Sequence, residues 1–475
     1  MWPVALLAVL ALVASACGGT TDDSASFDEA GGSVEGDESG ADAATAAPEA
    51  SEEELFESSR EATDDGAPPD AARDTTLNAG SIDDNERWED YLLYRQEFDA
   101  LGIPVSEIDV AGRRVLEVVD GDGSPVLGAE IEIVGDDGTA TSLTTYSDGR
   151  ALFHAPTAVD PDSQDRPTHT ARVTKGAAST EVDLDPGGAD QRIVLEGAGN
   201  GELALDVLFL VDATGSMADE IERLKANMVS ISEQIAGLPG EPDTRLAMTT
   251  FRDRGEDYVV DTVDFTSDVD GFVGAIGDVV ADGGGDTPES LGAALDEALA
   301  APSWRSGDAV KLVVLVGDAG PHLPGEPGYE DEPDYADAVR EAAARGVKIL
   351  PIASSGLDAF GEYVFRQLAQ VTMGRLVFLT YGADGSTPGT STPLNVDPDD
   401  YDVLSLDALV VQLAADELAP SRDDRPPDSL PSGYLAWSAG GTAQGAVPLI
   451  VGDLGVRRVL WVHGARFFVF SRSWV

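Results

Sequence analysis

The chain has 475 residues, of which 88 are acidic and 29 basic, so its formal net charge at pH 7 is −59. This charge repels the phosphate backbone of nucleic acids, which are therefore not expected as partners. One cysteine and four scattered histidines exclude internal disulfides and a cysteine-based metal site, and they form no evident zinc motif.

An apolar run opens the chain at residues 4–16. Its length of about 13 residues is too short to span a bilayer and is typical of a signal-peptide core, so residues 1–16 are predicted to be a signal peptide. The run ends in Ala14-Ser-Ala-Cys17-Gly, which resembles a bacterial lipobox with Ala14 where leucine is usual. That resemblance implies lipid attachment at Cys17 and a protein held by its lipid alone on the extracytoplasmic face of the cell membrane. An ordinary signal peptide followed by an incidental cysteine is the alternative.

Residues 17–76 have the composition of a disordered linker. They contain about 18 acidic residues and two arginines, separated by Ala, Gly, Ser and Thr. Such a segment cannot bury enough apolar surface to fold, and its charges extend it by self-repulsion. Helical spacing follows within 77–100, where five residues share one face: Trp88, Tyr91, Leu92, Arg95 and Phe98. We expect a helix over 77–100 that packs on a neighbouring domain.

Residues 107–196 show short strands joined by Asp- and Gly-rich turns, which predicts a small all-β sandwich. Six stretches carry this prediction: RRVLEVVD, AEIEIVG, ATSLTTY, ALFHAP, TARVTK and RIVLEG. The stretch VVDGDGSPVLGAEIEI and the later TTYSDGRALF resemble the carboxypeptidase regulatory-like, transthyretin-like sandwich. The Asp-rich turns do not fit a calcium-binding EF-hand, because Pro125 stands where that loop needs glycine and Ile131 where it needs the closing glutamate. They are interpreted as plain turns.

Residues 201–420 alternate apolar strands with amphipathic helices, which predicts an α/β domain with helices on both faces of a parallel sheet. The expected strands are 203–211, 244–251, 258–265, 311–316, 347–353 and 375–379, and the expected helices are 219–235, 291–300, 333–345, 359–371 and 403–418. About 200 residues are enough for such a domain to bury a core of its own.

Three loops of this segment carry oxygen donors next to a regular element. A buried strand runs into Asp212-Ala-Thr214-Gly-Ser216, the strand KLVVLV is followed by Asp318, and Thr287 lies just before a proline-started helix. Open α/β sheets bind ligands at the carboxyl ends of their strands. Carboxylate and hydroxyl oxygens without His or Cys suit a hard cation such as Mg²⁺. The first loop has an alternative interpretation, since threonine and serine are also favoured as helix caps.

These three loops, in this order, resemble a von Willebrand factor A domain with a metal-ion-dependent adhesion site, a Rossmann-like α/β fold, over residues 201–420. The resemblance implies these metal residues: Asp212, Thr214 and Ser216 in the first loop, Thr287 in the second and Asp318 in the third. Thr214 stands where the family usually has serine, and it keeps the hydroxyl. Glu289 is a further candidate ligand, because Asp286-Thr287-Pro-Glu289 also resembles a loop of integrin β-type I-like domains. A first-turn glutamate placed for the helix dipole is the alternative for Glu289.

The resemblance implies binding and not catalysis. A Mg²⁺ ion, or Mn²⁺ or Ca²⁺ in its place, that is held mainly by hydroxyls stays electrophilic and can take an Asp or Glu carboxylate from a partner protein. The chain contains no G-x-S-x-G elbow, no Walker loop and no G-x-G-x-x-G after a strand, and we predict that it is not an enzyme. Two functions follow: a lipid-anchored cell-surface protein that binds a partner through this metal, or a metal-independent structural or assembly component of the cell envelope.

Further charged residues surround the predicted metal site. His322 lies four residues after Asp318 and is expected in a supporting or surface position. Asp286, Glu289 and the segment 330–332 are expected to form a negative rim, so that partner binding is switched by the metal. The acids at 330–332 also suit the start of the following helix, and both interpretations stay open.

The tail, residues 421–475, is unassigned. It carries about six arginines against four aspartates and three of the six tryptophans, unlike the acidic chain before it. Its end is interpreted either as a β-hairpin that turns at His463-Gly464 or as a frame-shifted reading of the gene.

Overall fold

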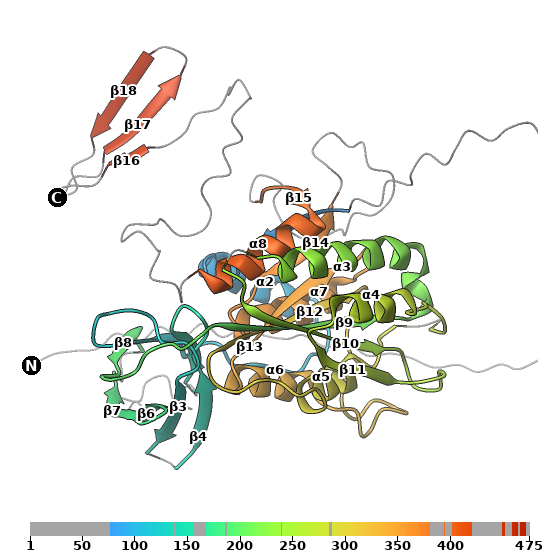
Figure 1. Ribbon diagram of the computed structural model, residues 1–475, viewed down its shortest axis with the longest axis horizontal. Helices are drawn as coiled ribbons and strands as arrows, with labels where there is room; N and C mark the ends of the chain where they lie inside the picture. The colour runs from blue at the N-terminus through green and yellow to red at the C-terminus, as the bar shows by residue number, and fades with distance from the viewer. Residues whose placement is uncertain are drawn as a thin grey trace, which may run out of the picture. The chain divides into compact units, whose positions relative to one another are not determined.

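A computed structural model describes residues 77–471, apart from residues 137, 156–167, 186–187, 239, 285–286, 381–393, 395–400, 420–448, 452–457 and 464–465 (Figure 1). The predicted signal peptide and the whole predicted linker, with Cys17, lie outside these residues, as does most of the tail. No helix within the described ranges is long and apolar enough to cross a membrane.

Eight strands form the central sheet, in the order β11-β10-β9-β12-β13-β14-β1-β15. Five of them run parallel: β9 (Ala204–Asp212), β10 (Asp243–Phe251), β12 (Ala309–Gly317), β13 (Val347–Ala353) and β14 (Leu376–Thr380). Three others run antiparallel to their neighbours: β11 (Val260–Thr266), β1 (Asn78–Ile82) and β15 (Leu404–Ser405). The predicted α/β fold is confirmed, with a mixed sheet in place of a parallel one.

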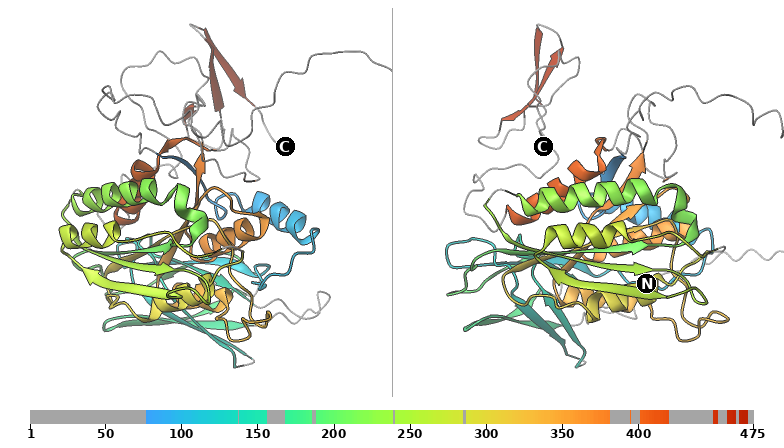
Figure 2. Two further views of the ribbon diagram at one scale, coloured as in Figure 1. Left: turned by 90° about the vertical axis from the view of Figure 1, so that its right-hand side faces the viewer. Right: turned by 45° about the vertical axis from the view of Figure 1, so that its right-hand side comes forward.

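Helices cover both faces of this sheet (Figures 1 and 2). One layer holds α3 (Ile221–Ala236), α4 (Val269–Gly277) and α8 (Leu406–Leu418), and the other holds α5 (Leu291–Ala300), α6 (Tyr335–Ala344) and α7 (Ala359–Val371). Alternate residues of β9 point into the two layers, so that Phe209 packs with the first and Leu210 with the second. Burial on both faces explains the long apolar runs within β9 and β12.

The prediction of one helix over 77–100 is wrong at its start. Residues Asn78–Ile82 form β1, which pairs antiparallel with β14, and only Trp88–Asp99 form a helix, α2. All five residues that indicated helical spacing lie in α2, and the periodicity contains no signal for the residues before them. A Cβ on Gly80 would overlap the ring of Tyr401, so this position of β1 requires glycine. The central sheet therefore includes a strand that precedes the predicted boundary at residue 201.

Residues 113–194 form two sheets that pack around one core, and all of their strand pairs are antiparallel except β2 with β8. The three-stranded sheet contains β2 (Arg113–Val119), β5 (Arg150–His154) and β8 (Gln191–Val194), and the four-stranded sheet contains β3 (Glu130–Gly135), β4 (Ala140–Thr144), β6 (His169–Lys175) and β7 (Ala178–Leu184). Strand β7 was not predicted, because it follows β6 after only two residues and its apolar positions are few. The Asp120 turn is closed by bonds from the backbone N–H groups of Asp122 and Ser124 to the Asp120 carboxylate, as expected of a plain turn.

Polar contacts join these two sheets to the α/β domain. Lys175 Nζ lies 2.5 Å from Asp308 Oδ1, and the Ser147 hydroxyl donates to Glu417 of α8 at 2.8 Å. Glu417 also pairs with the buried Lys348 of β13 at 2.5 Å.

In the tail, β16 (Leu449–Val451), β17 (Arg458–His463) and β18 (Arg466–Ser471) form a separate antiparallel sheet, and β17 and β18 are the predicted hairpin.

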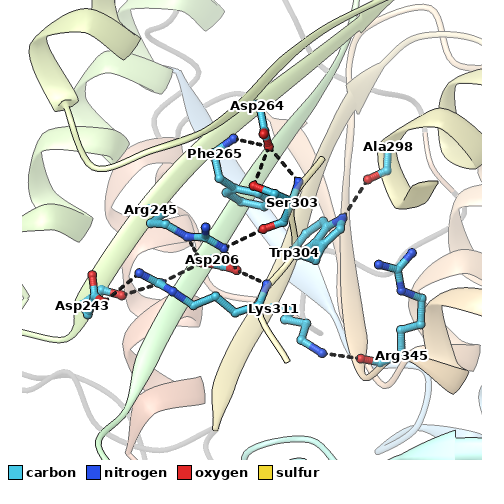
Figure 3. Close-up of polar contacts among 11 residues, drawn as sticks. Asp206, Asp243, Arg245, Asp264, Phe265, Ala298, Ser303, Trp304, Lys311 and Arg345 are labelled. Atoms are coloured by element: carbon cyan, nitrogen blue, oxygen red, sulfur yellow. Dashed lines mark hydrogen bonds and ion pairs between the residues drawn. The ribbon is translucent and has the colours of Figure 1, made fainter. Parts of the chain in front are cut away.

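At the amino-terminal ends of the parallel strands, two arginines surround the buried Asp206 in a network of ion pairs (Figure 3). Asp206 of β9 is fully buried, and its two oxygens accept from Arg245 Nε at 3.0 Å and Nη2 at 2.7 Å. Arg305 adds its backbone N–H at 2.9 Å and its Nη1 at 2.8 Å. Arg305 also pairs with the exposed Asp243. Each oxygen of Asp206 therefore accepts two hydrogen bonds, and the carboxylate as a whole is paired with two guanidinium groups.

Candidate metal centre

The first predicted loop begins where β9 ends. Asp212 is the last residue of this strand and is fully buried, and the next residue is bonded through its N–H to the Phe251 carbonyl at the end of β10. Thr214 donates to Asp212 Oδ1 twice, from its backbone N–H at 2.9 Å and from its hydroxyl at 2.6 Å. The Ser216 hydroxyl lies 3.1 Å from that of Thr214. Both hydroxyls of the loop are thus turned toward a buried carboxylate.

Helix capping does not explain these hydroxyls. Thr214 occupies the cap position of the short helix η1 (Gly215–Asp219), but its side chain makes no capping hydrogen bond. The next helix, α3, is preceded by Glu220, whose side chain makes no capping hydrogen bond either. The capping interpretation of Thr214 is therefore wrong, because its side chain is committed to Asp212.

The third predicted loop meets the first at the same edge. Asp318 directly follows β12, the parallel neighbour of β9, and its side chain is largely buried. The Ser216 hydroxyl donates to Asp318 Oδ1 at 3.1 Å. The four side chains Asp212, Thr214, Ser216 and Asp318 thus form one hydrogen-bonded cluster at the carboxyl ends of two adjacent strands, as the sequence predicted.

The electrostatics of this cluster favour a cation. Burial, and next the charge of the neighbouring Asp318, raise the pKa of Asp212 to about 7, against the hydrogen bonds from Thr214 and a smaller contribution of the Asp318 backbone N–H. Burial also raises the pKa of Asp318, against the hydrogen bond from Ser216. Asp212 Oδ2 is buried and has no hydrogen-bond partner. A buried carboxylate oxygen without a partner is costly, and a positive ion between the two acids would remove that penalty.

The second predicted loop is only partly joined to the cluster. Thr287 is exposed, and within the described residues no hydrogen bond connects it to the other predicted ligands. Glu289 is buried. Gly284 lies between Glu289 and Thr214: a Cβ placed on Gly284 would be 3.6 Å from Glu289 Oε1 and 3.3 Å from Thr214 Cβ. The Glu289 carboxylate therefore lies on the side of the first loop. Asp286 falls outside the described residues.

The donors are oxygen atoms of carboxylates and hydroxyls. Nowhere in the described ranges do three His, Cys, Asp or Glu side chains gather as a metal site. A centre built here would hence depend on hydroxyl donors and water as well as on the two aspartates, a set that suits Mg²⁺ better than Zn²⁺.

The predicted negative rim is partly wrong. Glu332 is buried and accepts from Arg254 Nη2 at 2.9 Å and from the N–H of Ala293, in the first turn of α5, at 3.2 Å. Glu332 thus supports the start of α5, and α6 is capped instead by Asp334. The exposed Asp331 also pairs with Arg254, at 2.6 Å. The loop folds back onto α5, which the sequence around 330–332 does not indicate.

His322 supports this loop. Its Nδ1 lies 2.8 Å from Glu326 Oε2, and its ring stacks on Tyr329 with the centroids 3.4 Å apart. The Tyr329 hydroxyl donates to Asp253, which also accepts from the Ser290 hydroxyl before α5. His322 is buried, so the surface alternative is wrong, and a supporting role beside the metal stays a prediction.

Residues 206–309 match the family model of the von Willebrand factor A domain. No curated protein matches the chain. Among solved structures, the SpRpn10 VWA domain is 16% identical with a TM-score of 0.26, over 35% of this chain and 82% of that one. The PilB minor pilin from Streptococcus sanguinis is 10% identical with a TM-score of 0.27, over 61% of this chain and 91% of that one.

The family match covers the loops of Asp212 and Thr287 and ends before Asp318. It begins in β9 and ends at the first residue of β12, and the eight-stranded sheet with helices on both faces continues the same fold beyond it. Residues 206–309 are thus similar to the von Willebrand factor A domain, and the sheet that contains them has a von Willebrand factor A-like α/β fold.

Proposed function

We propose that the protein is a lipid-anchored cell-surface protein that binds a carboxylate of a partner protein through a divalent cation in its von Willebrand factor A domain. The observation that carries this proposal is the buried Asp212 Oδ2, which has no hydrogen-bond partner and lies beside a second carboxylate. Most buried polar groups are hydrogen-bonded, and this one is a carboxylate oxygen beside a second acid, whose repulsion a cation would relieve.

Asp212, Ser216 and Asp318 are the side chains that would hold the cation, with Thr214 fixing the orientation of Asp212. Thr287 and Glu289 are the candidates from the second loop. The cation, Mg²⁺ or else Mn²⁺ or Ca²⁺, supplies a positive charge that a carboxylate of the partner can approach. That the protein is not an enzyme belongs to the same proposal, in which the cation serves to bind a carboxylate.

Calorimetric titration of Mg²⁺ into the purified full chain tests the site. We expect one bound ion, lost in Asp212→Ala and in Asp318→Ala, while Asp257→Ala, an exposed acid at the same edge, keeps the wild-type affinity. Thr287→Ala tests whether the second loop takes part. Unchanged affinity in Asp212→Ala would reject the assignment. The chain is used whole because β1 belongs to the same sheet as β9.

Partner binding is then measured by pull-down from a surface extract in Mg²⁺, in Ca²⁺ and in chelator. We expect capture with the metal and none in chelator, because two buried acids repel an incoming carboxylate until a cation neutralises them. Equal capture in all three conditions would support the structural or assembly role in the cell envelope instead.

The anchor is proposed from the sequence around Cys17. Acylation there would place the protein in the membrane fraction, and Cys17→Ser should release it, because the attached chains supply the membrane affinity. Wild-type protein found wholly in the soluble fraction would argue against the anchor without affecting the metal site.

A further inference from the structure

The segment 279–284, here called the collar, lies against the first metal loop. It connects the end of α4 to the loop of Thr287. The Asp282 N–H donates to the Ala213 carbonyl at 3.1 Å, and the Gly215 N–H donates to the Gly283 carbonyl at 3.0 Å. These two bonds hold the metal loop, residues 212–216, on either side of Thr214, the residue that orients Asp212.

Three charged side chains hold the collar in turn. Lys225 of α3 donates to the Val279 carbonyl at 3.0 Å, and Arg252 donates to the Val280 carbonyl at 2.9 Å. At the other end, Glu256 Oε1 accepts from the Gly284 N–H at 2.9 Å. The loop after β10 thus fixes the collar through one cation and one carboxylate.

The contact between collar and metal loop leaves no room for side chains. A Cβ on Gly215 would overlap the Gly283 carbonyl, and a Cβ on Gly283 would overlap the Glu256 carboxylate. Gly283 and Gly284 also have positive φ angles, of 78° and 69°, which favour glycine. The backbones approach this closely because all three positions are glycine, and the Glu256 bond closes the arrangement.

We propose that Glu256 is a positioning residue of the metal centre: it holds the collar through Gly284, and the collar holds residues 213–215 so that Thr214 and Ser216 face the two aspartates. This inference rests on the proposed metal function. Partners that orient metal ligands without touching the metal commonly contribute a factor of about 10 to 100 in affinity. Loss of the Glu256 bond should lower the fraction of molecules in which the loop is competent, and the apparent affinity with it.

A charge effect of Glu256 must be separated from its positional effect. In Glu256→Gln the amide oxygen can still accept the Gly284 N–H while the negative charge is gone, whereas Glu256→Ala removes both. Asp257→Asn removes one charge from the adjacent exposed residue and serves as the matched control.

Magnesium titration of the full chain is the first measurement. We expect Glu256→Ala to bind about tenfold or more weakly, and Glu256→Gln and Asp257→Asn to stay within about threefold of wild type. Wild-type affinity in Glu256→Ala would overturn the inference. So would an equal loss in Glu256→Gln and Glu256→Ala, since that pattern identifies charge and not position.

Hydrogen exchange without metal is the second measurement, and it does not depend on the proposed function. Peptides that cover 213–216 should exchange faster in Glu256→Ala than in wild type, Glu256→Gln should resemble wild type, and peptides from β12 should be unchanged in all variants. Unchanged exchange at 213–216 in Glu256→Ala would overturn the inference. Failure of the wild type to bind Mg²⁺, with the expected exchange pattern, would instead reject the metal function.

Discussion

Two buried aspartates on one strand have opposite surroundings. Asp206 and Asp212 lie near the two ends of β9, and both are completely excluded from solvent. Asp206 accepts four hydrogen bonds from Arg245 and Arg305. Asp212 receives two bonds on one oxygen, none on the other, and its charged neighbour is Asp318. The domain neutralises the first acid with its own arginines, whereas the second has no cationic partner of its own, as expected if Asp212 holds the proposed cation.

The largest expected effect is that of replacing Asp206. Asp206→Ala leaves two guanidinium groups, each about one-fifth exposed, without their buried partner, and should lower the free energy of unfolding by about 3–5 kcal/mol. Urea denaturation checks this. The control is Asp243→Ala, which removes an exposed partner of Arg305 and should cost less than about 1 kcal/mol. Similar losses in both variants would contradict the contrast between buried and exposed acids.

The Asp212→Asn substitution, in contrast, should raise the free energy of unfolding. The pKa of Asp212 is raised to about 7 in the folded protein, from 3.8 in the unfolded chain. The stabilisation by its protonated carboxyl is therefore fully present below about pH 4 and is lost as the pH rises through 7. In chelator at pH 8 the variant should therefore be more stable than wild type, by up to about 4 kcal/mol. Urea denaturation at pH 5 and pH 8 measures the difference. An unchanged pH dependence in Asp212→Asn would place the titrating group elsewhere.

The same pKa makes protons compete with the metal. Binding must deprotonate Asp212 below its pKa of about 7, so the Mg²⁺ affinity should fall by about 25-fold between pH 7.5 and pH 5.5. Titrations in two buffers with different ionisation enthalpies should show proton release at the lower pH. A pH-independent affinity would mean that Asp212 is already ionised in the metal-free protein.

Glu332 is a third buried acid and should give the smallest effect. It has one cationic partner, Arg254, which is itself about one-third exposed, so Glu332→Gln should lower the unfolding free energy by only about 1 kcal/mol. Asp331→Asn, at the exposed side of the same arginine, should give no measurable change. A loss at Glu332 as large as that at Asp206 would show that one guanidinium neutralises a buried acid as well as two do.

The site was predictable where it depends on strand ends. Asp212 and Asp318 each follow an apolar run, and parallel strands bring such residues to one edge whatever the loops do. Contacts made by loop on loop were not predictable. The burial of Glu332 against Arg254, the Glu256 bond to the collar and the exposure of Thr287 depend on backbone conformations that residue types alone do not determine. Strand β1 was missed because its partners lie about 300 residues away in the sequence.

The place of β1 in the sheet sets an order in time. Its residues leave the ribosome before the other strands of the sheet, yet its partners are Leu376–Thr380 and Leu404–Ser405, close to the end of the domain. At about 5–20 residues per second, roughly 15–60 s separate the synthesis of β1 from that of β14. Throughout that interval the strand has no edge to join, and α2 has no α7 to pack on. The first ordered residues of this domain are thus the last to be paired, and the domain can close only after nearly all of its chain has been made.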